Sequence, residues 1–428
     1  MESVVFRKDI QSQIAEIGGA DILVGIPSYN NARTIGHVVR AVQAGLVKYF
    51  PEMKCVLVNS DGGSTDGTMD VVQKASVEDF HAILLHHRIP PVFKITTPYQ
   101  GIPGKGSAFR TIFEMADALG VKACAVVDSD LRSITPEWLE LLVKPVIDGG
   151  FDYVAPLYHR HKYDGTITNS IVYPVTRALY GKRIRQPIGG DFGFSGSLAR
   201  HYLTKDVWES DVARYGIDIW MTTTAIADNF KVCQSFLGAK IHDAKDPGAD
   251  LSAMLHQVVG ATFDLMETYP DIWRKTADSV ATPVFGFTYA VGLEPVAVNL
   301  DRMIERFRLG VKELMDVWDL FLPKKITGML QHAAVSQKEQ FHIPEEVWAE
   351  IIYRFAVASH HKTLNREHLL KSLTPLYIGR TASFVMETAE RDSDDVEAKI
   401  EELCRRYEEK KAILINNWET QEVQHEHI

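Results

Sequence analysis

Short apolar runs alternate with amphipathic stretches over the first 130 residues. Residues 22–27 form an apolar run closed by Pro27, which predicts a buried strand. Between residues 32 and 50, apolar side chains recur every three or four positions, which predicts a helix. This alternation predicts a doubly wound, mostly parallel α/β sheet. Further strands are expected at 55–58, 92–96 and 123–127, and further helices from about 68 and at 107–119.

The pattern changes after residue 251. Residues 151–246 remain mixed, whereas long helical patterns dominate the rest of the chain, at 295–318, 344–359 and 395–418 among others. We therefore expect two domains, an α/β domain over residues 1–250 and a mainly helical one over 251–428. The helix at 395–418 is charged around most of its circumference, so we expect it at the surface or in a contact between copies of a homo-oligomer.

Composition and charge narrow the class of protein. The chain has 428 residues, of which 46% are hydrophobic, enough to fill the cores of two or three domains. Its net charge of -10 argues against a protein that coats nucleic acid. A nucleotide ligand remains compatible with that charge, because one local basic pocket is enough to hold a diphosphate.

Cysteine usage and the apolar segments bear on the cellular compartment. The four cysteines form no CxxC pair, and buried thiols fit a reducing compartment. The first 21 residues contain no apolar signal region, and no segment approaches roughly 18 uninterrupted apolar residues. We therefore expect a cytoplasmic protein without a membrane anchor.

Two acidic residues follow the expected strand at 123–127 directly. Asp128 and Asp130 flank Ser129, and two carboxylates brought together at the end of an apolar strand need a counter-charge. A divalent cation supplies that charge, and oxygen ligands suit Mg²⁺ or Mn²⁺. Ligands of parallel sheets bind at the carboxyl ends of strands, where this tripeptide falls. The alternative is an ordinary polar turn, because such tripeptides are common.

Three further features could bind a nucleotide or a metal. Lys105 lies in Pro-Gly-Lys-Gly at 103–106 before a predicted helix, where glycines admit an anion and the helix N-terminus favours negative charge. A simple turn explains these residues equally well. Asp61 ends the second strand, where it could accept a hydrogen bond from a base or serve only the turn at 59–68. His242 could complete a two-carboxylate metal site, although most lone histidines have no such role.

With these residues in view, the chain resembles the retaining glycosyltransferases of GT-A fold that make glycosylglycerates. The resemblance is strongest to the mannosylglycerate synthases and more distant to the glucosyl-3-phosphoglycerate synthases. Any one matching segment is weak, but six in the same order are specific. They lie at 103–106, 128–130 (with Pro-Glu-Trp at 136–138), 164–168, 186–191, 215–218 and 240–242.

The resemblance implies a Rossmann-like GT-A fold with a helical C-terminal region, and a role for each matching residue. Asp130 and His242 would bind Mg²⁺ or Mn²⁺ with Asp128 in support, and Lys105, Asp130 and Asp218 would form the catalytic set. The nucleotide would be held by Pro27, Tyr29, Asp61, Lys105, Asp128 and Ser129. The donor sugar would be held by Ile188, Gly189, Gly190, Asp191 and Asp218. The small-acid acceptor would be held by Arg160, Asp164, Gly165 and Thr168.

The implied activity is a metal-dependent, retaining transfer of mannose or glucose from a nucleotide-sugar, GDP-mannose or UDP-glucose, to D-glycerate or a close relative. The product would be a glycosylglycerate, a compatible solute. Relatives that prefer 3-phosphoglycerate tend to carry an arginine at the position of Thr166, so this chain favours an unphosphorylated acceptor. Asp191 stands where relatives usually have glutamate, so the fit around the sugar hydroxyls can differ.

Three alternatives remain open. The first is a GT-A enzyme with another acceptor, such as 3-phosphoglycerate or a glycosylglycerate. The second is a nucleotide-sugar nucleotidyltransferase, which places a glycine-rich basic loop after its first strand, where this chain has Pro-Ser-Tyr-Asn-Asn at 27–31. The third is an inert scaffold with a helical interaction region.

Overall fold

The chain is divided into two compact units by its internal contacts. The structure, a computed structural model, describes residues 6–75, 92–99, 101–242, 251–289 and 291–419. The first unit comprises Met1–Arg160, Ile184–Asp243 and Thr282–Glu294, and the second comprises His161–Arg183, Ala244–Ala281 and Pro295–Ile428. These units interleave along the sequence and so differ from the single boundary expected at residue 250. Residues 161–183 join the second unit because Tyr173 shares a buried cluster with Val396, Ile400 and Cys404.

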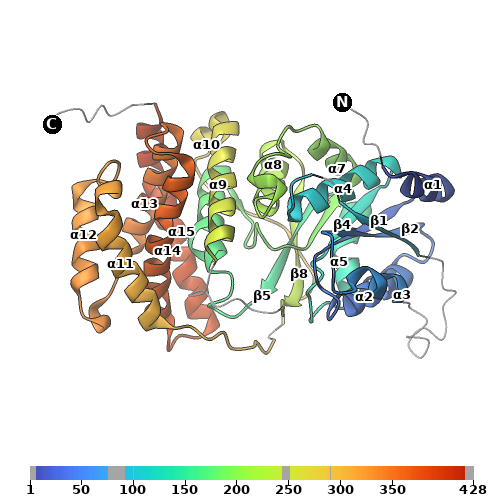
Figure 1. The fold of residues 1–428 in the computed structure, drawn as a ribbon, viewed down its shortest axis with the longest axis horizontal. Helices are drawn as coiled ribbons and strands as arrows, with labels where there is room; N and C mark the ends of the chain where they lie inside the picture. The colour runs from blue at the N-terminus through green and yellow to red at the C-terminus, as the bar shows by residue number, and fades with distance from the viewer. Residues whose placement is uncertain (1–5, 76–91, 100, 243–250, 290, 420–428) are drawn as a thin grey trace. The chain divides into compact units, whose positions relative to one another are not determined.

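An eight-stranded sheet forms the centre of the first unit (Figure 1). Its order is β10-β8-β5-β7-β4-β1-β2-β3, and all neighbours are parallel except β7, which is antiparallel to β4 and β5. The doubly wound, mostly parallel sheet predicted from the sequence is therefore confirmed. The strands are β1 (Ile22–Ser28), β2 (Cys55–Asp61), β3 (Phe93–Pro98), β4 (Ala123–Val126), β5 (Tyr153–His159), β7 (Phe192–Ser195), β8 (Val232–Ala239) and β10 (Val284–Phe285).

Helices cover both faces of this sheet, which is why its central strands can be apolar on both sides. Figure 1 shows α2 (Ile35–Tyr49), α3 (Thr68–Lys74) and α5 (Glu137–Ile147) on one face. The other face carries α4 (Lys105–Ala118), α7 (Gly196–Leu203) and α8 (Ile217–Ala227). The same unit contains α1 (Lys8–Ile17) and the 3₁₀ turn η3 (Asp211–Ala213). All residues of β1, β2 and β4 are buried.

The register of the strands brings three loops to one edge of the sheet. Ser28 at the end of β1 lies opposite Asp61 at the end of β2, and β1 also pairs in parallel with β4. The segments that follow β1, β2 and β4 therefore leave the sheet at the same carboxyl edge, where the sequence placed its candidate polar residues.

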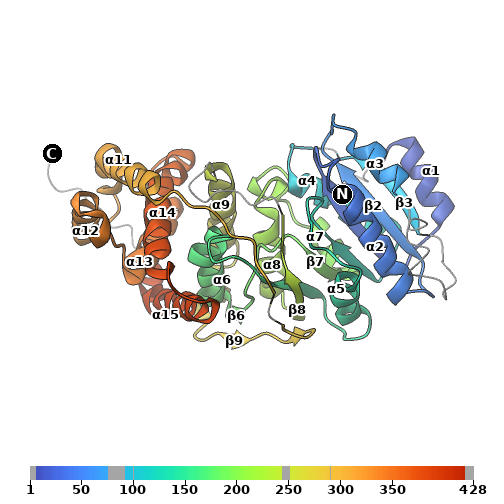
Figure 2. The same ribbon diagram turned by 90° about the horizontal axis from the view of Figure 1, so that it is seen from below.

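The second unit is almost entirely helical (Figure 2). Its longest members are α14 (Arg366–Thr388) and α15 (Ser393–Trp418); α14 packs against α11, α13 and α9, and α15 packs against α13 and α6. The helical patterns at 295–318, 344–359 and 395–418 correspond to α11, α13 and α15, so the predicted helical region is confirmed. The remaining elements are η2 (Thr168–Val172), α6 (Tyr173–Tyr180), β6 (Lys182–Arg183), α9 (Ser252–Thr268), α10 (Pro270–Lys275), β9 (Val280–Ala281), α11 (Leu300–Trp318), α12 (Lys324–Val335), η4 (Lys338–Gln340) and α13 (Glu345–His360).

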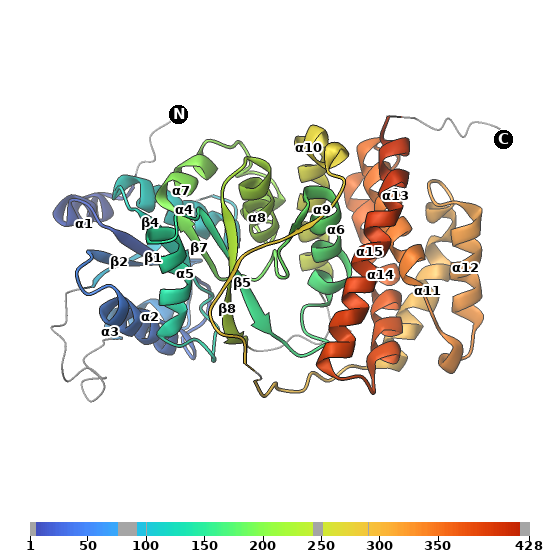
Figure 3. The same cartoon turned by 180° about the vertical axis from the view of Figure 1, so that it is seen from behind.

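The charged helix α15 lies beside α13 and α6 of its own unit (Figure 3). Leu403, Tyr407 and Leu414 on one of its faces are buried against neighbouring helices, although the mean hydropathy of the helix is low. Cys55, Cys124, Cys233 and Cys404 are buried and form no disulfide, as predicted. Among the described residues, no helix combines the length and the apolar character needed to cross a bilayer.

Candidate functional site

The loops that follow β1 and β2 are joined by side chains. Ser64 Oγ accepts a hydrogen bond from the Asn30 N–H (2.8 Å), and the Asn30 side-chain oxygen accepts one from the Thr65 N–H (3.0 Å). Asn30 has φ of 55°, a left-handed conformation that asparagine adopts more readily than most residues. These contacts fix the shape of both loops at the carboxyl edge of the sheet.

Asp61, predicted to hold the nucleoside, organises its own turn. The residue is 1% exposed. Its carboxylate accepts hydrogen bonds from the N–H groups of Gly63 (2.8 Å) and Ser64 (2.7 Å) and from the hydroxyls of Ser28 (2.9 Å) and Ser64 (2.7 Å). Four such bonds use the full acceptor capacity of a carboxylate. A nucleobase would have to replace one of these donors, so the nucleoside role of Asp61 stays a prediction beside its observed role in the turn.

Two predicted nucleotide-binding residues are linked through Asn31. Tyr29 is 62% exposed just beyond Pro27, which lies within β1. The Asn31 side-chain oxygen accepts hydrogen bonds from the Tyr29 N–H (2.9 Å) and from the Ser129 hydroxyl (2.8 Å). The structure thus brings the loop after β1 to the acidic segment after β4. Sequence reasoning missed Asn31, although an asparagine pair directly after a buried strand is a usable turn signal.

A buried lysine, Lys240, lies at the centre of the site, and sequence reasoning assigned it no role. Its side chain is 2% exposed immediately after β8. The ammonium group donates hydrogen bonds to Asp128 (2.7 Å), to the carbonyl oxygen of Gly189 (2.7 Å) and to Asp191 (2.8 Å). These contacts use all three of its N–H bonds. The sequence did contain a signal, a lysine directly after an apolar strand. Because an unpaired buried cation is costly, a lysine at such a position is expected to have acidic partners.

Asp191, predicted to bind the donor sugar, lies fully buried next to Lys240. Its carboxylate also accepts hydrogen bonds from the Asp128 N–H (2.8 Å) and from the Tyr158 hydroxyl. Burial raises the pKa of Asp191 above its ordinary value, although the charge of Lys240 opposes the shift. In this arrangement, the hydrogen bonds of Asp191 hold Lys240 and the backbone of Asp128 in place. The contact of Asp191 with a donor sugar stays a prediction.

The turn before Asp191 requires its glycines. Gly190 has φ of +88°, and a Cβ there would lie 2.2 Å from Asp128 Oδ2 and 2.9 Å from Lys240 Nζ. A Cβ on Gly189 would lie 2.2 Å from Pro156 Cγ. The half-buried Ile188 precedes them. The predicted donor-sugar turn is therefore packed directly against the acidic segment after β4.

Lys105 at the start of α4 is brought together with two acids that the sequence also singled out. Its Nζ lies 2.9 Å from Asp128 Oδ1 and 3.3 Å from the Asp218 carboxylate. Burial opposes protonation of this lysine, but Asp128 and Asp218 raise its pKa above the ordinary range. Burial likewise opposes ionisation of Asp128, yet Lys105 and Lys240 hold the pKa of Asp128 well below its usual range. Burial raises the pKa of Asp218.

The two glycines beside Lys105 are explained by packing. A Cβ on Gly106 would lie 1.8 Å from the carbonyl oxygen of Val212, and one on Gly104 would lie 2.5 Å from that of Ala213. The Gly106 N–H donates to the carbonyl oxygen of Arg214 (3.2 Å). These glycines therefore let α4 begin close against residues 212–214, and they do not open its backbone to an anion as the sequence suggested. Binding of an anion by the Lys105 side chain stays a prediction.

Asp130 is the acid of the site that forms no direct ion pair with a described residue, although the charges of Lys240 and Lys105 act on it from a distance. Within the described part of the chain, no hydrogen bond or ion pair from another residue engages its half-buried carboxylate. Burial and the negative charge of Asp128 raise the pKa of Asp130. The lysines Lys105 and Lys240 face four carboxylates, those of Asp128, Asp130, Asp191 and Asp218. Arg160 adds a third positive charge that acts on Lys240, so negative charge remains in excess when all of these groups are ionised.

A divalent cation would suit the carboxylate oxygens of this cluster, because a hard cation prefers oxygen ligands and offsets negative charge. His242 comes from the adjacent segment: the Arg132 N–H donates to the carbonyl oxygen of Ile241 (2.9 Å), and the Ile241 N–H donates to Ser133 Oγ (2.9 Å). No cluster of three or more His, Cys, Asp or Glu side chains suited to a metal occurs among the described residues. A metal at Asp130 would therefore also need oxygen atoms from its substrate.

The predicted acceptor residues belong to different units. Arg160 ends the first segment of the first unit, where its guanidinium lies 5.7 Å from the centre of the Tyr158 ring. Asp164, Gly165 and Thr168 belong to the second unit, where Gly165 has φ of +76° and Thr168 begins the π-helical turn η2. Their joint role in binding an acceptor stays a prediction.

A model of a known protein family matches the part of the chain that contains most of the residues described above. Residues 23–208 match the model of Glycosyl transferase family 2. This range runs from β1 through α7 and contains Lys105, Asp128, Asp130 and Asp191, whereas Asp218, Lys240 and His242 lie beyond it. No curated protein matches the sequence.

Several solved structures are similar to part of the chain. Glucosyl-3-phosphoglycerate synthase from Mycobacterium tuberculosis in complex with Mg²⁺ and UDP is 22% identical with a TM-score of 0.44, over 59% of this chain and 83% of that one. The same synthase with Mn²⁺, UDP-glucose and phosphoglyceric acid is 22% identical with a TM-score of 0.44, over 62% of this chain and 86% of that one.

Proposed function

We propose that this protein is a metal-dependent, retaining glycosyltransferase that moves a hexose from a nucleotide diphosphate sugar to D-glycerate or a closely related small acid. The observation that carries the proposal is the charged cluster at the carboxyl edge of the sheet. It contains two buried or half-buried lysines and four carboxylates, of which that of Asp130 forms no direct ion pair with a described residue. Most of the cluster lies in the range that matches the glycosyl transferase model. A diphosphate with a divalent cation is a ligand that such a cluster suits.

Each residue has a distinct part in this proposal. Asp130 and His242 would hold the metal with Asp128 in support, and the metal would stabilise negative charge on the departing diphosphate. Lys105 would bind the same diphosphate through its ammonium group, exchanging part of its contact with Asp128 and Asp218 for phosphate oxygens. Asp218, which the lysine would then release, would accept hydrogen bonds from sugar hydroxyls.

The acceptor would be oriented by its carboxylate and hydroxyls. Arg160 would pair with the carboxylate, because a guanidinium matches its two oxygens. Asp164 and Thr168 would bind the acceptor hydroxyls. The attacking hydroxyl would approach from the face that the diphosphate leaves and pass its proton to a departing phosphate oxygen, so the anomeric configuration would be retained.

The activity is tested by direct assay. UDP-glucose and GDP-mannose are incubated separately with D-glycerate or 3-phosphoglycerate in the presence of Mn²⁺, and products are identified by mass and by the anomeric coupling in proton NMR. We expect a glycosylglycerate with the configuration of the donor. A product of inverted configuration, or no product with any of the four pairs, would contradict the proposal.

The metal is tested without turnover. UDP with Mn²⁺ should raise the melting temperature of the wild-type protein, and Asp130→Asn should lose that rise while keeping the melting temperature of the ligand-free protein. Asp117→Asn is the matched control, because Asp117 lies on the surface of α4 in an exposed pair with Arg200 (2.7 Å). An undiminished rise in Asp130→Asn would remove Asp130 from the metal site.

A further inference from the structure

A lysine at the beginning of segment 162–170 in the second unit binds this segment to the C-terminal end of helix α14. Lys162 Nζ donates hydrogen bonds to the carbonyl oxygens of Thr388 (2.5 Å), Ala389 (2.9 Å) and Arg391 (3.1 Å). Thr388 is the last residue of α14, and Ala389 and Arg391 follow it. Carbonyl groups at a helix C-terminus have no partner within the helix and favour a positive charge. Lys162 therefore caps the helix and ties the segment to it.

The middle of the segment is tied to the same helix by buried hydroxyl groups. The Thr166 and Tyr377 hydroxyls lie 2.6 Å apart, and the two residues are 4% and 2% exposed. The Tyr163 hydroxyl donates to the carbonyl oxygen of Val385 (3.3 Å), and its ring packs edge-on against Phe384 (6.5 Å). Over roughly three turns, α14 thus contacts the segment at Tyr377, Phe384–Val385 and its C-terminal carbonyls.

The end of the segment is held by two other helices. The carbonyl oxygen of Ser170 accepts hydrogen bonds from Trp348 Nε1 of α13 (2.8 Å) and from the Tyr407 hydroxyl of α15 (2.9 Å). The Ser170 hydroxyl donates back to the carbonyl oxygen of Thr166 (2.7 Å). Asp164, Gly165 and Thr168 lie between these anchors, so the position of their backbone is set by the helices.

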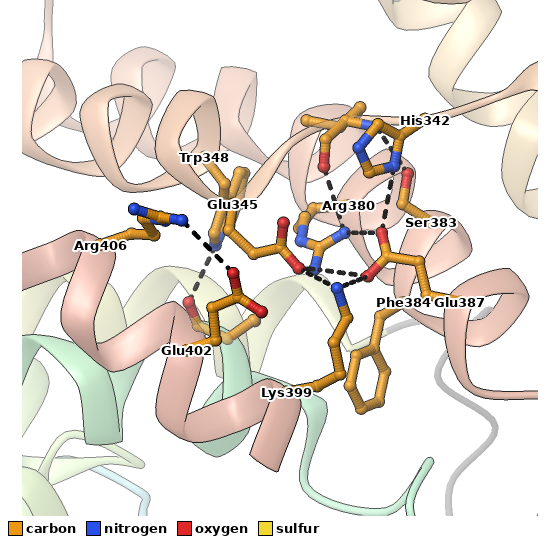
Figure 4. A network of polar contacts seen from close by, with 12 residues as sticks. His342, Glu345, Trp348, Arg380, Ser383, Phe384, Glu387, Lys399, Glu402 and Arg406 are labelled. Carbon is orange, nitrogen blue, oxygen red and sulfur yellow. Dashed lines mark hydrogen bonds and ion pairs between the residues drawn. The ribbon is translucent and has the colours of Figure 1, made fainter. Parts of the chain in front are cut away.

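Helix α14 is itself fixed to α13 and α15 by a charged network (Figure 4). Arg380, 3% exposed and one turn after Tyr377, pairs with Glu387 (2.6 Å) and with Glu345 (3.4 Å). Lys399 of α15 pairs with the same two glutamates, at 2.6 Å to Glu345 and 3.2 Å to Glu387. Two cations thus face two carboxylates, and none of these charges is left over to bind a ligand. The network is suited to holding α14 in place.

We propose that α14 is the platform that positions the acceptor-binding segment, and that Tyr377 is a positioning residue for the acceptor. This inference rests on the proposed function, because it takes Asp164 and Thr168 as acceptor ligands. Tyr377 lies 211 residues from Thr166 in the sequence and does not itself touch the acceptor. It acts by holding Thr166, and with it the backbone between Asp164 and Thr168.

The inference predicts a selective loss of acceptor affinity. Tyr377→Phe and Thr166→Val each remove the 2.6 Å hydrogen bond, and we expect the KM for the acceptor to rise about five-fold, as the loss of one net hydrogen bond implies. The kcat and the affinity for UDP with Mn²⁺ should stay within about two-fold, because the first unit is unchanged. The double variant should match either single one, because both lose the same bond.

Thr262→Val is the matched control for these variants. Thr262 is 3% exposed in α9, and its hydroxyl donates a hydrogen bond to the carbonyl oxygen of Val258 in its own helix (2.8 Å). Hydrogen–deuterium exchange of residues 162–170 gives a second readout that needs no activity. Exchange should be faster in Tyr377→Phe and in Lys162→Met than in the wild type and in the exposed control Lys371→Met, whose ion pair with Glu367 lies on the surface.

The outcomes separate this inference from the function on which it rests. Faster exchange together with a raised acceptor KM supports it. Unchanged exchange in both variants overturns the platform, and an unchanged KM, or an equal loss of kcat and UDP affinity, overturns the positioning role of Tyr377. If the wild-type protein transfers no sugar, the proposed function and the acceptor role of the segment fall together, whereas exchange still decides whether α14 holds it.

Discussion

Replacing Lys240 with methionine should destabilise the first unit strongly. The substitution keeps most of the length of a side chain that is 2% exposed but removes its ammonium group, which is bonded to Asp128, Gly189 and Asp191 within 2.8 Å. Asp128 would keep Lys105, but Asp191 would be left fully buried without a counter-charge. Removing one partner of a buried ion pair costs about 3–5 kcal/mol. For a unit of this size, that corresponds to a fall in melting temperature of about 6–20 °C.

The assay is thermal unfolding followed by circular dichroism, with Lys205→Met as the matched control. Lys205 also pairs with an aspartate in the first unit (Asp228, 2.7 Å), but its side chain is 30% exposed. The control should therefore lose no more than about 1 kcal/mol. A fall in Lys240→Met that is no larger than in the control would refute the reasoning.

A second substitution identifies the cause of the loss. Asp191→Asn removes the buried charge that Lys240→Met leaves unpaired, so the double variant should recover about 1 kcal/mol or more relative to Lys240→Met alone. If the stability losses of the two single variants simply add in the double variant, the instability of Lys240→Met comes from the space left by the ammonium group or from the lost contact with Gly189. The broken ion pair is then not its source.

Two further predictions follow from the packing and the charges. Gly190→Ala should be strongly destabilising in thermal unfolding, because its Cβ would lie 2.2 Å from Asp128 Oδ2 at φ of +88°, whereas Gly120→Ala, with φ of +63° and nothing within 4 Å, should show only the backbone cost of about 1–2 kcal/mol. Glu387→Gln should destabilise the second unit in a pH-dependent way. Burial alone would raise the pKa of Glu387, but His342, Arg380 and Lys399 hold this pKa well below the ordinary value of 4.5. The ionised carboxylate therefore stabilises the fold above pH 4.5, and this stabilisation is lost as the pH falls below 4.5. The difference in urea unfolding free energy between wild type and Glu387→Gln should therefore shrink as the pH falls from about 5 to about 3.5, and a difference that stays constant over that range would contradict the assignment.

The sheet could be predicted because its central strands are buried on both faces and so appear as continuous apolar runs. The runs at 22–27, 55–58 and 123–127 fall within β1, β2 and β4 or extend them by one residue. The short antiparallel strand β7 was not found, because a strand of Phe192–Ser195 with a glycine inside it has no period of its own. Its place between β4 and β5 depends on pairing with distant strands.

The partners within the site could not be predicted from the sequence, even though many of its residues were. The segments 128–130, 189–191 and 240–242 are each visible as polar turns after apolar runs. Lys240, however, bonds to Asp128 across 112 residues and to Asp191 across 49. Such pairing is set by the order of β8, β5, β7 and β4 in the sheet. Likewise, the hydrogen bond between Thr166 and Tyr377 could not be predicted from the local sequence pattern, because the two residues lie far apart in the sequence.

The positions of the two lysines explain why the two acids of Asp128-Ser129-Asp130 are not equivalent. Both oxygens of Asp128 are engaged, Oδ1 by Lys105 at 2.9 Å and Oδ2 by Lys240 at 2.7 Å. An added cation would have to displace a lysine to bind Asp128, and displacing Lys240 would also strip the buried Asp191 of its counter-charge. Asp130 carries no such attachment, so a divalent cation would gain most by binding there. In the proposed mechanism, the lysines would therefore direct a metal to Asp130 and leave Asp128 in support.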